Sequence, residues 1–384
     1  MIFTAMLTLF LLVAPCIVKA QDQDHRAGVI ILNELWRTDP DDEPYFRSLS
    51  HFLLHRGELF VLDSRSITLS AYSLKGNLLR SMDLGGEGPG ELFGPVGLLP
   101  ITDFTIGLMS VMGPRLVLVS TDGSPSYELG HSEMKCYTNS RDFSLAYTAE
   151  CRAGKLYYSG EQSIDRRLYL ARCDLSGFQE YIYMEWPLES SPGDLVLDES
   201  DAFVLSNKNW CTGSRERVYV AEERNGHDHY SIVVFEGDDE LFSIRKPFVS
   251  RSRSDEEIKL LRDGPVGGAK GYDAFVSLGG KVKVDEYDPD VRELVEIEGT
   301  LWVRTSRSED DPRGRTYDLF GLDGTFMGRR QLIMDGINWR KDDVHFLDEG
   351  YVVIVKGEYD ALHPGADQEQ DPLQFILARV GGRE

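Results

Sequence analysis

Two short stretches of this chain carry side chains that could bind metal ions. Asp285, Asp288 and Asp290 offer carboxylate oxygens, the ligands that Ca²⁺ prefers. The stretch lacks the glycine placement and the closing glutamate of an EF-hand loop, so calcium at these residues is left only as an open alternative. His227 and His229 flank Asp228 near a predicted hairpin tip, but a zinc site needs three or four converging ligands. No other histidine joins a recognisable set, and we predict no metal site and no cofactor.

No stretch has the pattern of a catalytic nucleophile, because no Gly-x-Ser-x-Gly elbow is present. The glycine-rich stretch 85–95 could cradle a phosphate, but no Lys-Ser/Thr pair follows it and the next predicted element is a strand. Its glycines adopt positive φ at little cost and Pro89 stiffens the turn, which favours a tight connection between structural units. We therefore predict no catalytic residue and no phosphate site.

The formal net charge of −23 over 384 residues limits the partners of this chain. Nucleic acids and anionic membrane surfaces are disfavoured, because proteins bind them through Lys and Arg side chains. Many of the acids recur in predicted connections between structural units: Glu87, Glu91, Asp194, Asp198, Glu199, Asp201, Asp285, Glu286, Asp288, Asp290, Asp342 and Asp343. Together with the long loops 306–315 and 357–372, they predict one acidic face that would favour a cation or a basic partner. The alternative is a solvated acidic surface without a ligand.

A strand–turn–strand pattern recurs along the chain about every fifty residues and predicts the fold. One hairpin per unit has its glycine at Gly57, Gly154, Gly299 or Gly350, and a second has its glycine at Gly76, Gly123, Gly177 or Gly324. We count six units, over about 48–85, 96–130, 144–188, 202–249, 291–332 and 344–380. Short hairpins require antiparallel strands, and several of these strands are apolar on both faces, as strands covered by neighbouring sheets are. A two-sheet sandwich explains such strands less well, so the pattern predicts an all-β, six-bladed β-propeller.

The sixth unit contains only three strands, which leaves one strand to be supplied from elsewhere. The apolar segment 28–36 has no partner of its own, and pairing it beside residues 375–380 would close the ring and remove an exposed edge. Between the fourth and fifth units, Ser254 and Glu257 form a capping-box pattern that predicts a short helix over about 254–263. The preceding charged run, which begins at Arg251, is interpreted as a solvated lead-in to that helix.

The N-terminus reads as an export signal. Residues 1–18 are uncharged and mostly apolar, and Val18 and Ala20 suit cleavage after Ala20, although no Lys or Arg lies near Met1. We predict a signal peptide over 1–20, one domain over 21–384, no membrane span after cleavage, and a periplasmic, cell-envelope or extracellular location. A retained anchor is the alternative.

Export permits disulfides among Cys136, Cys151, Cys173 and Cys211. A bond between Cys151 and Cys173 is disfavoured by their expected separation, and a bond between Cys151 and Cys211 is easier. Unpaired thiols are equally consistent with the sequence.

Stretch 85–95, together with segments such as Leu59-Phe-Val-Leu-Asp63 and Leu301-Trp-Val-Arg304, resembles exported bacterial six-bladed β-propellers related to the NHL-repeat group. The resemblance covers most of the chain after about Ser48 and implies a fold and an envelope location, but no chemistry. The leading hypothesis is a non-enzymatic binding or scaffold module that presents an acidic loop face to an unknown protein or small-molecule ligand. The alternative is a metal-dependent propeller hydrolase or lyase, similar to lactonases or amidating lyases.

Overall fold

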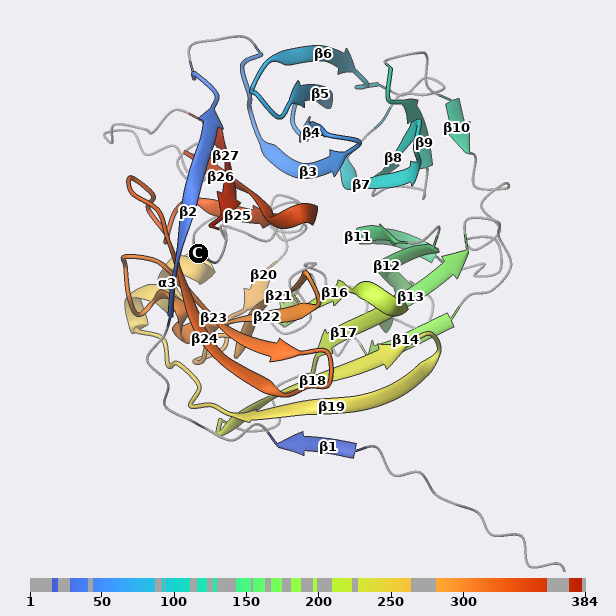
Figure 1. Ribbon diagram of the computed structural model, residues 1–384. Helices are drawn as coiled ribbons and strands as arrows, with labels where there is room; N and C mark the ends of the chain where they lie inside the picture. Colours follow the sequence, from blue (N-terminus) through green and yellow to red (C-terminus); the bar gives the residue numbers. More distant parts are fainter. Residues whose placement is uncertain are drawn as a thin grey trace, which may run out of the picture.

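The structure is a computed structural model that describes residues 16–19, 28–40, 44–86, 92, 94–110, 116–122, 127–129, 143–152, 155–162, 167–174, 181–187, 196–198, 209–222, 227–263, 281–357 and 373–381 (Figure 1). Most of these residues are in β-strands, and most of the strands form small antiparallel sheets. The sheets are arranged around a common centre in a propeller-like manner. Among the described residues, no helix combines the length and the apolar character needed to cross a membrane.

Three sheets contain four antiparallel strands each. The first is β3 (Leu49–His55), β4 (Glu58–Asp63), β5 (Thr68–Ser73) and β6 (Leu78–Asp83). The second is β7 (Pro95–Thr102), β8 (Thr105–Ser110), β9 (Leu116–Ser120) and β10 (Tyr127–Leu129). The third is β11 (Phe143–Arg152), β12 (Lys155–Gln162), β13 (Arg167–Asp174) and β14 (Tyr181–Pro187).

A fourth sheet consists of β16 (Trp210–Thr212), β17 (Arg217–Ala221), β18 (His229–Glu236) and β19 (Asp239–Pro247), with β1 (Cys16–Lys19) added in parallel at the outer edge of β19. An eight-stranded sheet has the order β21 (Val291–Ile297), β22 (Thr300–Thr305), β23 (Arg315–Gly321), β24 (Phe326–Ile333), β2 (Gly28–Arg37), β27 (Gln374–Val380), β26 (Tyr351–Lys356) and β25 (Asp343–Phe346). A short parallel pair joins β15 (Val196–Asp198) to β20 (Lys281–Lys283).

The predicted pairing between the chain ends is present. The second half of β2 pairs with β27 in antiparallel register, from Leu32 opposite Val380 to Arg37 opposite Ile376. The first half of β2 pairs in parallel with β24, which the sequence did not predict. Trp36 then reaches the first sheet, because its Nε1–H donates to the carbonyl of Leu74 over 3.1 Å. The N-terminal strand therefore connects three parts of the molecule that are distant in sequence.

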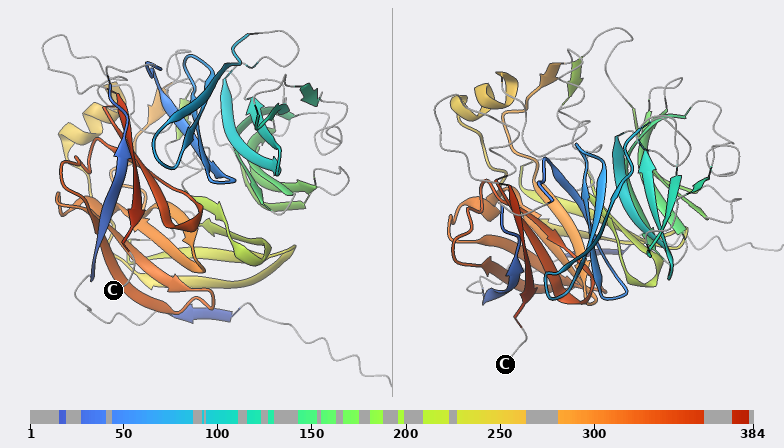
Figure 2. Two further views of the ribbon diagram at one scale, coloured as in Figure 1. Left: turned by 45° about the horizontal axis from the view of Figure 1, so that its top comes forward. Right: turned by 90° about the horizontal axis from the view of Figure 1, so that it is seen from above.

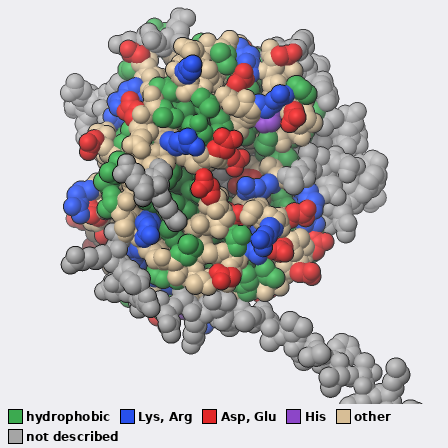
Figure 3. All heavy atoms as spheres, in the orientation of Figure 1, with side chains coloured by type: hydrophobic (Ala, Val, Ile, Leu, Met, Phe, Trp, Pro, Cys, Tyr) green, Lys and Arg blue, Asp and Glu red, His purple; other side chains and the backbone are tan. Residues whose placement is uncertain are grey.

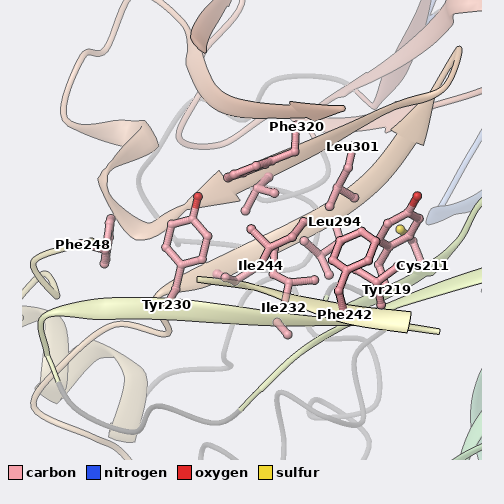
Figure 4. Close-up of a cluster of buried hydrophobic side chains, with 14 residues drawn as sticks. Cys211, Tyr219, Tyr230, Ile232, Phe242, Ile244, Phe248, Leu294, Leu301 and Phe320 are labelled. Carbon is pink, nitrogen blue, oxygen red and sulfur yellow. The ribbon is translucent and has the colours of Figure 1, made fainter. Parts of the chain in front are cut away.

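The hydrophobic core of the described residues consists of six clusters, each between two neighbouring groups of strands. Figure 4 shows the cluster between β16–β19 and β21–β23, where Phe242 and Ile244 face Leu301 and Phe320. Another cluster joins Leu59 and Val61 of the first sheet to residues of β26 and β27. Strands covered on both sides are apolar on both faces: β17 is buried along its whole length, whereas the outer strand β6 is largely exposed.

The predicted helix is α3 (Asp255–Asp263), and its capping box is formed. The backbone N–H of Glu257 donates to Ser254 Oγ over 3.2 Å, and the N–H of Ser254 donates to Glu257 Oε2 over 2.8 Å. Figure 2 shows α3, β15 and β20 on one side of the ring of sheets, opposite the end of β27. We call that side the α3 face.

Candidate functional site

The stretch interpreted as a solvated lead-in to α3 contributes to a group of ion pairs on the α3 face, so that interpretation was wrong for Arg251 and Arg253. Asp288 is 2% exposed and forms ion pairs with Arg251, with Arg253 at 2.7 Å and with Arg292 at 2.8 Å. The backbone explains this convergence, because residues 251–253 run antiparallel to 286–288 and the N–H of Arg253 donates to the carbonyl of Glu286. We call these four residues the arginine cluster.

The arginine cluster fixes the charge of its central carboxylate and also holds α3. Burial alone would raise the pKa of Asp288, but the charges of Arg292 and Arg253 and the hydrogen bonds of the arginines outweigh burial and lower it. Arg251 also pairs with Glu257, the capping-box residue of α3. The cluster therefore ties the helix to the first residues of β21. Arg251 and Arg292 are each about 30% exposed, at 30% and 31%, so both guanidiniums remain partly accessible to a ligand.

The predicted acidic face holds only in part. Asp285 and Glu286 are exposed, but Asp288, Asp290 and Asp342 are buried and cannot contribute to a solvated acidic surface. Asp343 lies 3.8 Å from Arg315, and in the 306–315 loop Asp311 lies 2.6 Å from Arg313. The side chains of Glu87, Glu91, Asp194, Asp198, Glu199 and Asp201, and nearly all of the 357–372 loop, lie outside the described residues. Several acids in these connections thus pair with arginines, whereas Asp342 accepts from the backbone N–H of Asn338, because a buried carboxylate requires a hydrogen-bond or ionic partner.

The two stretches considered for metals do not converge on an ion. Asp288 is occupied by guanidiniums, which argues against calcium at Asp285, Asp288 and Asp290. The ring of His227 stacks on Tyr287 with a centroid separation of 4.0 Å, whereas His229 Nδ1 lies 2.5 Å from Asp228 Oδ1. The two imidazoles therefore engage different partners. Within the described ranges, no group of three or more His, Cys, Asp or Glu residues is arranged to hold a metal ion.

A second polar site lies near the centre of the ring, and it was not predicted from the sequence. Glu150 at the end of β11 accepts hydrogen bonds from Thr212 N at 2.9 Å and Thr212 Oγ1 at 2.6 Å. From the opposite side, Glu296 of β21 accepts from Ser214 N at 2.8 Å and Tyr219 OH at 2.7 Å. The two glutamates lie on neighbouring sheets and accept hydrogen bonds from both ends of the turn 212–214. We call this arrangement the glutamate clamp. A Cβ on Gly213 would lie 2.7 Å from Tyr219 Cε2, so this close approach requires glycine.

The pKa values of Glu150 and Cys211 are raised, but this does not make a nucleophile. Burial raises the pKa of Glu150, and the hydrogen bonds from Thr212 offset only part of that effect. Cys211 is buried and carries a free thiol, whose pKa is raised well above its usual value by burial and by the charges of Glu150 and Glu296. A protonated thiol is a poor nucleophile. Glu150 and Glu296 each lie a few residues before a predicted hairpin glycine, Gly154 and Gly299. A charged residue in a strand that otherwise faces inward was the sequence feature that could have indicated this site.

The remaining cysteine and glycine predictions are placed as follows. Cys151 and Cys173 both stand opposite Leu156, one on each side of β12, which agrees with the two-strand separation expected for them. The free thiol of Cys211 excludes a bond between Cys151 and Cys211 here, and Cys136 lies outside the described residues.

The glycine-rich stretch 85–95 is described only in part, because residues 87–91 and 93 lie outside the described residues. Leu92 N donates to the carbonyl of Leu84 over 2.7 Å, so the two ends of this stretch are held together as a connection.

Charged and polar side chains also gather around the centre on the face opposite α3, as Figure 3 shows. Between neighbouring sheets, Arg152 donates to the carbonyl of Thr212 over 3.1 Å, and Lys155 pairs with Glu216 of the adjacent sheet. On the opposite side of that sheet, Arg217 donates to the carbonyl of Leu322. These groups bridge neighbouring sheets, as the glutamate clamp does.

The comparisons with known proteins concern the fold. The chain matches no family model and no curated protein. Among solved structures, a protein described as exported from Bacteroides fragilis aligns with a TM-score of 0.50 at 12% identity, over 96% of this chain and 100% of that chain. Regucalcin, a calcium-binding protein from Agrobacterium tumefaciens, aligns with a TM-score of 0.46 at 13% identity, over 93% and 98%. A PQQ-bound aldose sugar dehydrogenase from Streptomyces coelicolor aligns with a TM-score of 0.43 at 12% identity, over 88% and 95%. At these identities a likeness concerns the fold alone, and no activity follows from it.

Proposed function

We propose that this chain is an exported six-bladed β-propeller, related to the NHL-repeat group, that acts as a non-enzymatic binding or scaffold module of the cell envelope. In this proposal the segment 1–20 is removed as a signal peptide and residues 21–384 fold as one propeller domain. The α3 face, with the partly exposed arginines of the arginine cluster, is the binding face.

The six-bladed architecture is supported by the arrangement of the core. The eight-stranded sheet divides at the parallel pair between β24 and β2 into two halves of four strands, so that with the other four-stranded groups it supplies six blades. Each of the six hydrophobic clusters in the described residues fills the space between two successive blades, and one of them joins the first blade to the last. Stacked sheets that close in this way leave few unpaired edges.

The observation that supports the scaffold function is that hydrogen bonds of charged and polar side chains link neighbouring blades. The glutamate clamp joins three successive blades, Tyr230 OH donates to Asp318 Oδ2 over 2.9 Å across the second of these two junctions, and Arg315 Nη2 donates to the carbonyl of Asp342 over 2.7 Å across the next. Buried polar groups that are satisfied in this way stiffen a fold. A ring of rigid blades holds its loops in fixed positions, which favours a module that binds through preformed surfaces.

Metal analysis of the purified protein, combined with thermal unfolding in excess EDTA, tests this function against the hydrolase or lyase alternative. We expect metal at well below one equivalent and a Tm that EDTA leaves unchanged, since the ties between blades are made by side chains. Stoichiometric Ca²⁺ or Zn²⁺ that EDTA removes, with a fall in Tm, would favour the metal-dependent enzyme.

Export is tested separately by expressing the full chain in a Gram-negative bacterium, fractionating the cells and sequencing the N-terminus. The proposal requires the protein in the periplasmic or outer fraction with Gln21 as its first residue. A cytoplasmic protein that still carries Met1 would contradict it.

A further inference from the structure

The outer edge of β19 accepts an additional strand in this structure. β1 pairs with it in parallel, with Cys16 opposite Phe242, Ile17 opposite Ser243, Val18 opposite Ile244 and Lys19 opposite Arg245. Figures 1 and 2 place β1 outside the ring, beside β19. A strand at a sheet edge presents unpaired N–H and C=O groups, which another extended segment can satisfy through main-chain hydrogen bonds.

The inner side of β19 is held rigidly, so its edge is formed in advance. Phe242 and Ile244 are 8% and 1% exposed and pack in the cluster of Figure 4. Gly324 of the next sheet approaches so closely that a Cβ there would lie 2.8 Å from Phe242 Cε2. A preformed edge lowers the entropic cost of adding a strand.

A buried lysine completes this anchoring at the other end of β19. Lys246 is 2% exposed, and its Nζ lies 3.5 Å from Asp318 Oδ2 and 4.8 Å from the centre of the Phe326 ring. Because side chains alternate along a strand, residues next to these anchors point away from the core: Leu241 is 41% exposed and Arg245 is also exposed. One face of β19 is thus packed against the core and the other is accessible.

We infer that the outer edge of β19 is a strand-acceptor site whose occupant in the exported protein is an extended apolar segment of a partner protein, added in parallel as a fifth strand. This inference rests on the proposed function, because cleavage after Ala20 would remove β1 and leave the edge open to a partner. Residues 16–19, Cys-Ile-Val-Lys, indicate the sequence class that the edge takes: short, extended and rich in β-branched residues.

Hydrogen exchange of the full chain, expressed without export, tests the site directly. Successive backbone N–H groups of a strand point to opposite sides. A proline at one of two neighbouring positions of β1 therefore removes an N–H that points to β19, and a proline at the other position removes an N–H that points to solvent. Ile17→Pro and Val18→Pro are therefore a matched pair. We expect one of them to accelerate exchange of the backbone amides of 242–245 by about tenfold, and the other to have little effect.

The occupant is then supplied in trans as a synthetic peptide of residues 14–20. In the variant with fast exchange, the peptide should restore protection of 242–245, whereas the same peptide with the disruptive proline should not. The Tm of both variants should stay close to that of the parent, since β1 lies outside the core. Slow exchange in both variants, or no protection by the peptide, would overturn the strand-acceptor site. Neither result bears on the metal content and N-terminus that test the proposed function.

Discussion

The glutamate clamp uses a half-buried carboxylate and the arginine cluster a fully buried one, and they use them in opposite ways. Glu150 accepts hydrogen bonds from neutral donors of Thr212, and burial raises its pKa. Asp288 accepts them from three guanidiniums, which lower its pKa despite burial. The same functional group is thus destabilised as an anion near the centre of the ring and stabilised as an anion on the α3 face.

This difference separates two structural roles. Near the centre, the carboxylate serves as an oxygen acceptor for a turn, and its charge is an electrostatic cost. On the α3 face, the negative charge of Asp288 is needed, because it offsets the repulsion among the three arginines that surround it. Removing the charge should therefore be tolerated at one site and damaging at the other.

The largest expected effect is that of Asp288→Asn, which leaves the guanidiniums of the arginine cluster without their central anion. Removing one partner of a buried ion pair typically costs about 3 kcal/mol or more. Urea unfolding measures the loss, with Asp335→Asn as control, because Asp335 is exposed and should change stability by less than about 0.5 kcal/mol. Equal stabilities of the two variants would show that the arginines do not depend on Asp288.

At the glutamate clamp, Glu150→Ala should destabilise by about 2 kcal/mol, because the N–H and hydroxyl of Thr212 lose their acceptor in the interior. Glu150→Gln keeps an acceptor oxygen and removes the charge, so its stability should stay within about 0.5 kcal/mol of the parent or exceed it. The same denaturation experiment applies. If Gln is as damaging as Ala, the carboxylate charge matters at the clamp as it does at Asp288.

Ser254→Ala should have a smaller effect, about 1 kcal/mol, through the lost helix cap. It tests whether the arginine cluster holds α3 independently of the cap. Exchange of the α3 amides should accelerate while those of residues 286–288 stay protected. Faster exchange in both segments would mean that the helix and the cluster open as one unit.

The smallest expected effect is a difference in pH dependence between the two sites. The pKa of Glu150 is raised from its ordinary value of 4.5 in the folded state, so stability increases as the pH falls through that raised pKa towards 4.5. Glu150→Gln should lose this increase. The pKa of Asp288 is lowered from 3.8, so its stabilisation is present above about 3.8 and is lost as the pH falls through the lower folded value.

Chemical denaturation from pH 7 to pH 3 measures both dependences. The parent should gain relative to Glu150→Gln on mild acidification, and should lose its advantage over Asp288→Asn only at the acidic end. A parallel pH profile for the parent and Glu150→Gln would contradict the raised pKa of Glu150.

Features that depend on neighbouring residues were predictable from the sequence. Ser254 and Glu257 are three residues apart and form the predicted cap, and Gly57, Gly299 and Gly350 adopt the positive φ that their hairpins require. The pairing of β2 with β27 followed from counting strands, since an incomplete last unit needs a partner. The parallel pairing of β2 with β24 had no such signal.

The charged sites were missed because their partners are distant in sequence. Asp288 meets Arg251 across 37 residues, and Glu150 meets Thr212 across 62. The sequence showed acids in connections and arginines before a helix, but residue type alone does not say which charges will meet. Exposed acids and acids paired with arginines are the same residue types, so the sequence alone does not distinguish them.

By itself, the sequence determined the all-β character, the positions of most hairpins and the helix cap, because these depend on glycine placement, side-chain alternation and contacts within a few residues. Only the tertiary structure decided which carboxylates are buried, which side chains pair across sheets and which edge accepts a strand. Those properties follow from the stacking of sheets, which brings together residues that no local pattern relates.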